Sequence, residues 1–189
     1  MTYKTTAINN RRYLGNKYKL LPFISKVVDE NCYNVNIFAD LFAGTGSVSS
    51  AFYDKIIITN DILYSNYICN LAWFGHEKFD SGILKNIIVE YNALQTDEDN
   101  YMSINFADTF FGRDDCKKIG FIRDDIEHKY NVGVINERER ALLITSLLYA
   151  MDKIANTCGH YDAYRQGVEY SKKLELYYPD ANNDNNSSN

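Results

Sequence analysis

Residues 35–61 restrict the fold of this chain most strongly, because two apolar runs, each leading into an acid, flank a glycine-rich turn. The first run, VNIFADL, has the β-branched and aromatic content of a buried strand, and the second, KIIITND, is a shorter strand. Between them, Phe42 to Gly46 forms the turn, and Ser47 to Tyr53 begins a helix. A strand, a glycine turn, a helix and a second strand within about thirty residues predict a βαβ unit with parallel strands.

The composition is typical of a soluble globular protein, since 46% of the 189 residues are hydrophobic and 24% are charged. No segment approaches the roughly eighteen consecutive apolar residues of a membrane span, and the polar N-terminus lacks the apolar core of a secretory signal. We therefore expect a cytoplasmic protein with no membrane partner. The four cysteines form no CxxC pair and the three histidines are scattered, so we expect reduced thiols and no metal site.

Beyond the βαβ unit, the spacing of apolar residues predicts a largely helical chain. The expected helices cover residues 20–28, 62–74, 81–94, 114–130 and 137–159, and residues 96–103 form a polar loop. Asn136 is the expected N-cap of the last helix and Gly159 its C′ residue. Apolar positions nearly surround that helix, which indicates that it is buried on most sides.

The glycine turn is suited to a ligand that carries a ribose. Gly44 and Gly46 allow a tight turn and a close approach to backbone amides, and Asp61 stands where an acid can bind both ribose hydroxyls. Ser49 replaces the third glycine of the dinucleotide fingerprint, and Asp40 would repel a pyrophosphate. S-adenosylmethionine, which is cationic and has no phosphate, fits these charges better than NAD. The alternative is a turn that merely joins two elements, with Asp61 as a strand-end acid or helix N-cap.

Several segments also resemble one family. RRYLGNK, FADLFAGTGS and TNDILYSNY together resemble the adenine-specific DNA methyltransferases related to the Dam enzyme, and MDKIANTCGHYDAYR resembles members found in restriction–modification systems. The resemblance covers roughly residues 10–170. It implies an α/β, Rossmann-like methyltransferase fold that uses S-adenosylmethionine to methylate adenine in double-stranded DNA. The residues to which it gives a part of the cofactor pocket are Tyr13 and Lys17, which close it, Phe42, Ala43, Gly44 and Gly46, which wrap the methionine part, and Asp61 and Ile62, which hold the ribose and the adenine ring.

The catalytic motif of that family is absent. The family uses an Asp/Asn/Ser-Pro-Pro-Tyr motif, on which a flipped adenine is stacked and hydrogen-bonded, whereas the prolines here are Pro22 and Pro179. We therefore assign no catalytic residue. The chain stops in an Asn/Ser-rich segment, about where such enzymes would continue into the catalytic strand. It is a subunit whose partner supplies the motif, a truncated enzyme, or a module that only binds the cofactor. The complete set of cofactor residues favours the first two, and an incomplete sheet would expose an edge and apolar faces that need a partner.

Two segments are candidates for contact with DNA, although the formal net charge of −5 argues against a uniformly basic surface. The basic residues near 113–123 alternate with acids, which indicates a solvated surface helix. GHYDAYRQ offers stacking, a phosphate partner and a hydrogen-bond donor through His160, Tyr161, Tyr164 and Arg165. The alternative is an aromatic clasp onto the core with Arg165 paired to Asp162.

The leading hypothesis is the cofactor-binding part of an adenine methyltransferase with an incomplete parallel sheet. We divide the chain into a cofactor-binding part at residues 1–80, a mostly helical target-recognition lobe at 81–170, and a polar tail at 171–189 that we expect to be disordered. The missing motif favours a non-catalytic module as the alternative. An NAD-dependent oxidoreductase is disfavoured by Ser49 and Asp40.

Overall fold

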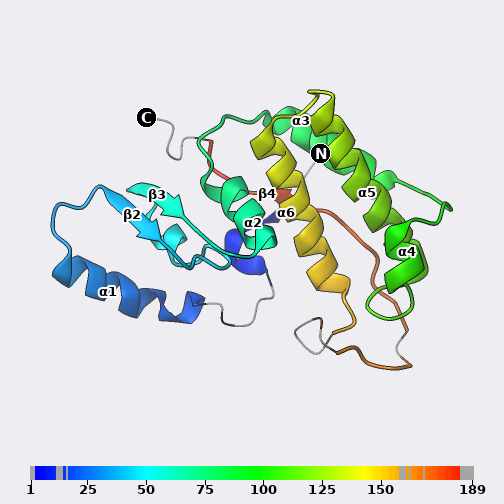
Figure 1. Cartoon of the computed structure of the whole chain (residues 1–189), viewed down its shortest axis with the longest axis horizontal. Helices are drawn as coiled ribbons and strands as arrows, with labels where there is room; N and C mark the ends of the chain where they lie inside the picture. Colours follow the sequence, from blue (N-terminus) through cyan, green and yellow to red (C-terminus); the bar gives the residue numbers. More distant parts are fainter. Residues whose placement is uncertain are drawn as a thin grey trace.

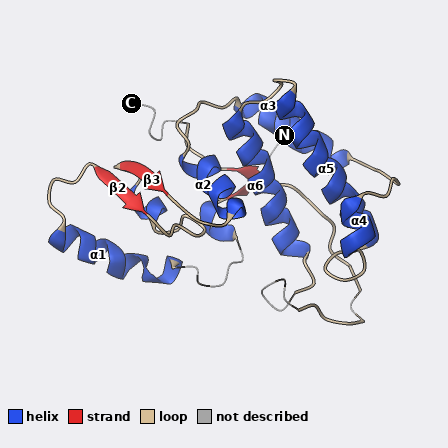
Figure 2. Cartoon of the chain, in the orientation of Figure 1, coloured by secondary structure: helices blue, strands red, loops and turns tan. Residues whose placement is uncertain are grey.

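The computed structural model describes residues 3–11, 15, 17–157, 161, 163–167 and 169–183 as a mixed α/β chain (Figure 1, Figure 2). The strands β2 and β3 lie with α1 on one side of the molecule, and α3 to α6 lie on the other, with α2 between them (Figure 1). The strands are β1 (Thr5–Thr6), β2 (Ile37–Asp40), β3 (Ile56–Thr59) and β4 (Tyr178–Pro179). The α-helices are α1 (Leu21–Asn31), α2 (Tyr64–Phe74), α3 (Ser81–Ala93), α4 (Tyr101–Phe106), α5 (Arg113–Asn131) and α6 (Glu137–Ile154). No helix in these described ranges is long and apolar enough to cross a membrane.

The predicted parallel pairing of the two strands is confirmed, because β2 and β3 pair in parallel from Ile37 with Ile56 to Asp40 with Thr59. The helix expected to begin at Ser47 is wrong, since the structure has only a short 3-10 helix, η3 (Ser49–Phe52). Side chains explain the difference: Ser50 Oγ donates to the Ser47 carbonyl, which competes with a regular α-helical turn. The βαβ unit is therefore a pair of parallel strands joined by a compact loop.

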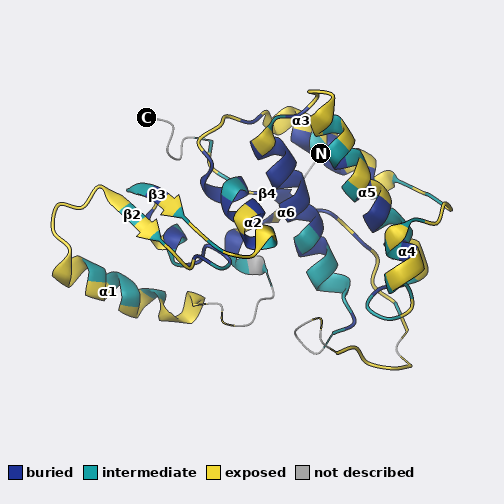
Figure 3. Ribbon diagram, viewed as in Figure 1, coloured by how far each residue is buried: buried dark blue, intermediate teal, exposed yellow. Residues whose placement is uncertain are grey.

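One face of this strand pair is covered and the other is exposed. Phe38 and Ile57 point to the face that packs on Phe52, and the rings of Phe38 and Phe52 stack with centroids 4.2 Å apart. On the opposite face Ile37 and Ile58 stay about half exposed, and Figure 3 shows exposed residues along both strands. The described part of the chain therefore leaves an apolar sheet face in solvent.

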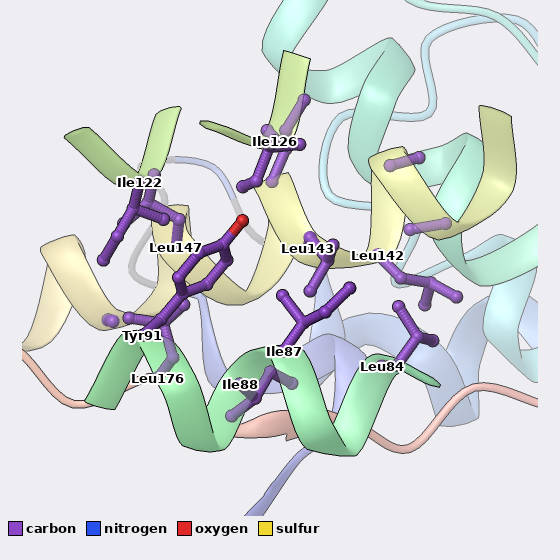
Figure 4. Close-up of a cluster of buried hydrophobic side chains, with 14 of the residues drawn as sticks. Leu84, Ile87, Ile88, Tyr91, Ile122, Ile126, Leu142, Leu143, Leu147 and Leu176 are labelled. Atoms are coloured by element: carbon purple, nitrogen blue, oxygen red, sulfur yellow. The ribbon is translucent and has the colours of Figure 1, made fainter. Parts of the chain in front are cut away.

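Helix α6 is the centre of the helical part and packs against α2 and α5. Its N-terminus is capped as predicted, because the Asn136 side chain accepts from the Glu139 amide while Glu139 accepts from the Asn136 amide. Apolar side chains of α3, α5 and α6, including Ile87, Ile122 and Leu143, meet in the main core (Figure 4). The predicted burial of α6 on most sides is confirmed.

The predicted C-terminal end of α6 is wrong. The helix ends at Ile154, so Gly159 is not its C′ residue. Beyond the helix, the Asn156 amide donates to the Phe110 carbonyl over 2.8 Å, and its side chain donates to the Thr109 carbonyl over 3.2 Å. Contacts with a distant segment thus replace the next helical turn.

Part of the segment assigned to a disordered tail is folded, which corrects the boundary at residue 171. Leu174, Leu176 and Tyr178 are buried in the main core, and Tyr178–Pro179 forms β4, which pairs in parallel with β1. Asn92 of α3 holds this segment through two hydrogen bonds with the backbone of Leu176. The alternation of apolar residues in LELYY was the sign of a half-buried strand.

Candidate functional site

The glycine turn is fastened across the carboxyl ends of β2 and β3. The Ala43 amide donates to the Asn60 carbonyl over 3.0 Å, and the Asn60 side chain donates to the Leu41 carbonyl over the same distance. Residues 41–46 and 60–63 therefore form one surface at the strand ends, where ligands of parallel α/β units bind.

Both glycines of the turn have left-handed backbone, with φ of 55° at Gly44 and 78° at Gly46. A Cβ on Gly46 would lie 2.6 Å from Oδ1 of Asn70 and 2.8 Å from the ring of Phe74. Because α2 supplies both neighbours, Gly46 is required for packing against that helix. Asn70 also donates to the Gly44 carbonyl over 3.2 Å, which fixes the turn from the same side.

Asp61 joins the turn to the start of α2. Its Oδ2 accepts from the Gly44 amide over 2.8 Å, and its Oδ1 accepts from the Leu63 amide over 2.9 Å and from Nδ2 of Asn66 over 3.1 Å. Burial alone would raise the pKa of Asp61, but these hydrogen bonds and the charge of Lys17 outweigh it and lower that pKa. A carboxylate offers about four acceptor positions, so one remains for a hydroxyl group.

The second acid, Asp40, is bound by the same serine that departs from the dinucleotide fingerprint. Ser49 Oγ donates to Asp40 Oδ2 over 3.1 Å, and Ser49 is fully buried. A glycine at this position could not form that bond. Ser49 therefore orients the carboxylate that stands at the mouth of the turn.

The apolar residues around the two acids divide into buried and exposed ones. Ala43 is buried, whereas the side chains of Phe42 and Ile62 are 83% and 97% exposed. Lys17 lies near enough to Asp61 for its charge to act on the carboxyl group, and Tyr13 falls outside the described residues. The structure thus brings the described members of the predicted pocket to one end of the strand pair.

The GHYDAYRQ segment packs on the core through its aromatic residues. The ring of Tyr161 lies 5.4 Å from that of Phe110, and Tyr164 meets the same ring edge-on at 5.6 Å. The carbonyl of Arg165 accepts from the Asn156 side chain over 2.7 Å. His160 and Asp162 lie outside the described residues. The aromatic clasp is present, and contact with DNA stays a prediction.

The basic residues of α5 pair with acids of the same protein. Arg113 Nη1 donates to Asp99 over 3.3 Å, and Lys117 Nζ donates to the Asp97 carbonyl over 2.7 Å. This pattern agrees with the predicted solvated surface helix. Among the described residues, no group of three or more His, Cys, Asp or Glu side chains is arranged to hold a metal ion.

A hollow of about 1000 Å³ lies away from the strand ends, between the end of α2 and the α5–α6 loop. His76, Glu77, Tyr130 and Glu139 are among its lining residues. None of the predicted cofactor residues lines it, so we assign it no role in cofactor binding.

The buried Asn66 is a site residue that the sequence reasoning missed, although it contacts Asp61 directly. Its sign in the sequence was an asparagine within the apolar helix that follows Asp61, at a position where a buried amide needs polar partners.

Comparisons with known proteins converge on one family. The family model for D12 class N6 adenine-specific DNA methyltransferases matches residues 13–189. The chain is 35% identical over 166 residues to the modification methylase LlaI of Lactococcus lactis and 32% identical over 176 residues to the modification methylase StsI of Streptococcus sanguinis. These matches cover 81% of this chain but only 27% and 26% of the relatives. With the methyltransferase M.NlaIII of Neisseria lactamica, identity is 29% over 87% of this chain and 52% of the relative. No solved structure matches.

Proposed function

Because the chain belongs to the D12 class of N6 adenine-specific DNA methyltransferases, we propose that the surface at the ends of β2 and β3 binds S-adenosylmethionine. The methyl group would pass to the exocyclic amino group of adenine in double-stranded DNA. The observation that carries the proposal is Asp61, whose carboxylate is held by the Gly44 amide and retains one acceptor position.

The residues at this surface suit the parts of that cofactor. Asp61 accepts a ribose hydroxyl, and Asp40 supplies negative charge near the sulfonium and ammonium groups. The exposed side chains of Phe42 and Ile62 offer apolar surface to the methionine part and the adenine ring. Lys17 and Tyr13 close the pocket in this proposal. Two carboxylates at the mouth would repel the phosphates of NAD.

We further propose that the catalytic motif comes from outside the residues present here, either from another segment or from a second subunit. The sequence contains no Pro-Pro pair. The exposed sheet face with Ile37 and Ile58 is the surface that additional strands or helices of a Rossmann-like fold would cover. In this proposal residues 1–80 bind the cofactor, 81–170 recognise the target with His160, Tyr161, Tyr164 and Arg165 near the DNA, and the enzyme works in the cytoplasm.

Calorimetric titration of the purified chain with S-adenosylmethionine and with NAD tests the cofactor. We expect S-adenosylmethionine to bind and NAD not to bind. Asp61→Ala should weaken binding by about 1.5–3 kcal/mol, because a charge-assisted hydrogen bond is lost. Asp54→Ala removes an exposed acid before β3 and serves as the control.

The opposite results would end the proposal: binding of NAD alone, or an affinity for S-adenosylmethionine that does not change in Asp61→Ala. Asp61→Asn keeps the shape of the side chain, so thermal unfolding of both variants separates a local effect from misfolding. A methylation assay on DNA tests the second part. We expect activity only when a polypeptide with the Pro-Pro motif is added, and activity of the chain alone would contradict it.

A further inference from the structure

Asn66 is a buried asparagine of α2 whose two polar atoms face two different charged residues. Its Nδ2 donates to Asp61 Oδ1 over 3.1 Å, and its Oδ1 accepts from Nη1 of Arg11 over 3.0 Å. These partners fix the orientation of the carboxamide, because a flipped amide would turn an N–H group toward the guanidinium. Arg11 thus determines which atom of Asn66 faces Asp61.

Arg11 is itself held inside the protein. Its Nη1 also lies 3.5 Å from the sulfur of Cys69, and its Nε lies 3.8 Å from Oδ2 of Asp152, near the end of α6. The side chains of Arg11 and Asp152 are only 10% and 13% exposed. A buried ion pair of this kind is costly to break, since either charge would be left without compensation.

Asp152 continues the contacts to the aromatic segment. A side-chain hydrogen bond joins Tyr161 to Asp152. Burial and the negative charge of Asp152 raise the pKa of Tyr161, so that its hydroxyl stays protonated as the donor. The ring of Tyr161 packs between Phe110 and Phe111, with centroid distances of 5.4 and 6.1 Å.

We propose that Asn66 and Arg11 are positioning residues that hold the Asp61 carboxylate in its binding orientation. Through Asp152, the same contacts extend to Tyr161 in the segment after α6. Binding of the methyl donor at Asp61 and docking of Tyr161 are therefore energetically coupled. This inference rests on the proposed function, because it takes Asp61 to be a cofactor residue.

The physical basis of the coupling is burial, because water does not readily replace a hydrogen bond lost between these side chains. If Tyr161 undocks, Asp152 loses a hydrogen bond and attracts Arg11 more strongly, which changes the bond from Arg11 to Asn66. The donor that Asn66 presents to Asp61 then shifts, in a setting where an unmade hydrogen bond is expensive. Coupling of this kind is reciprocal, so cofactor binding must also stabilise the docked Tyr161.

Tyr161→Phe tests the proposal, because it removes the hydroxyl and keeps the ring on Phe110. We expect the Kd for S-adenosylmethionine, measured by calorimetry, to rise about fivefold or more. Tyr170→Phe is the matched control, because its hydroxyl lies in the same region but donates to the Thr109 carbonyl, over 3.0 Å, rather than to Asp152. We expect its Kd to stay within about twofold of the wild-type value.

A double-mutant cycle separates positioning from a general loss of stability. Asn66→Asp keeps the size of the side chain and removes the donor to Asp61. If the contacts act as one unit, the effects of Asn66→Asp and Tyr161→Phe on the Kd will not add. Thermal unfolding of each variant provides the second readout, since a merely structural role would lower the melting temperature without producing this non-additivity.

The outcomes distinguish the two proposals. If Asp61→Ala weakens binding while Tyr161→Phe and Tyr170→Phe behave alike, the coupling is refuted and the cofactor site stands. Additive effects of Asn66→Asp and Tyr161→Phe would refute it as well. An unchanged Kd in Asp61→Ala would instead refute the proposed function.

Discussion

Gly46 is the residue of the turn with the least room for change. A Cβ there meets Asn70 and Phe74 of α2 at distances under 3 Å, and its φ of 78° disfavours any other residue. Gly46→Ala should therefore lower the free energy of unfolding by about 3 kcal/mol in urea denaturation, as strain and overpacking add. Gly133→Ala is the control, because Gly133 has a φ of 76° and a Cβ added to it would have no neighbour within 4 Å. It should cost only about 1 kcal/mol, and equal losses would show that α2 yields to the extra methyl group.

At the same scale, the sequence placed the acids of the site but not their partners. The order of apolar runs and turns put Asp40 and Asp61 at strand ends, since that follows from local spacing alone. The bonds from Ser49 to Asp40 and from Asn66 to Asp61 depend on how η3 and α2 pack. No periodicity encodes such contacts, so they needed the structure.

The N-terminus of α6 shows what a local motif contributes to an element. Asn136 accepts from the Glu139 amide and also donates to the Lys78 carbonyl over 2.7 Å. Asn136→Ala should lower the free energy of unfolding by about 1–2 kcal/mol in urea denaturation, because a buried helix loses its cap. Asn136→Ser retains a capping oxygen and should recover about half of that loss. No recovery would mean that the bond to Lys78, rather than the cap, is the important one.

Helix starts were predictable from the sequence where a side chain caps the backbone, as at Asn136. Helix ends were not, because tertiary contacts decide them: α6 stops where Asn156 turns to bond with Thr109 and Phe110. The same reason explains β4, whose residues were assigned to a tail. Its two residues form a strand only because Thr5 and Thr6 lie beside them.

For the whole molecule, the helical core was predictable from apolar spacing, but the asymmetry of the sheet was only inferred from the absent catalytic motif. The structure gives that inference a specific surface. Ile57 and Ile58 are neighbours on β3 that face opposite sides, and they are 8% and 51% exposed. An exposed apolar face of a sheet is a surface for association rather than a stable end state.

Substitution of these two isoleucines tests whether that face is open in solution. Ile58→Lys should bind less of a fluorescent hydrophobic dye, self-associate less in sedimentation, and change the free energy of unfolding by only about 0.5 kcal/mol. Ile57→Lys should destabilise the chain by about 3 kcal/mol or more, because it places a charge against Phe52. In the presence of a polypeptide that completes the sheet, Ile58→Lys should become the damaging variant for assembly. If it is as destabilising as Ile57→Lys in the isolated chain, then the face is already covered and needs no partner.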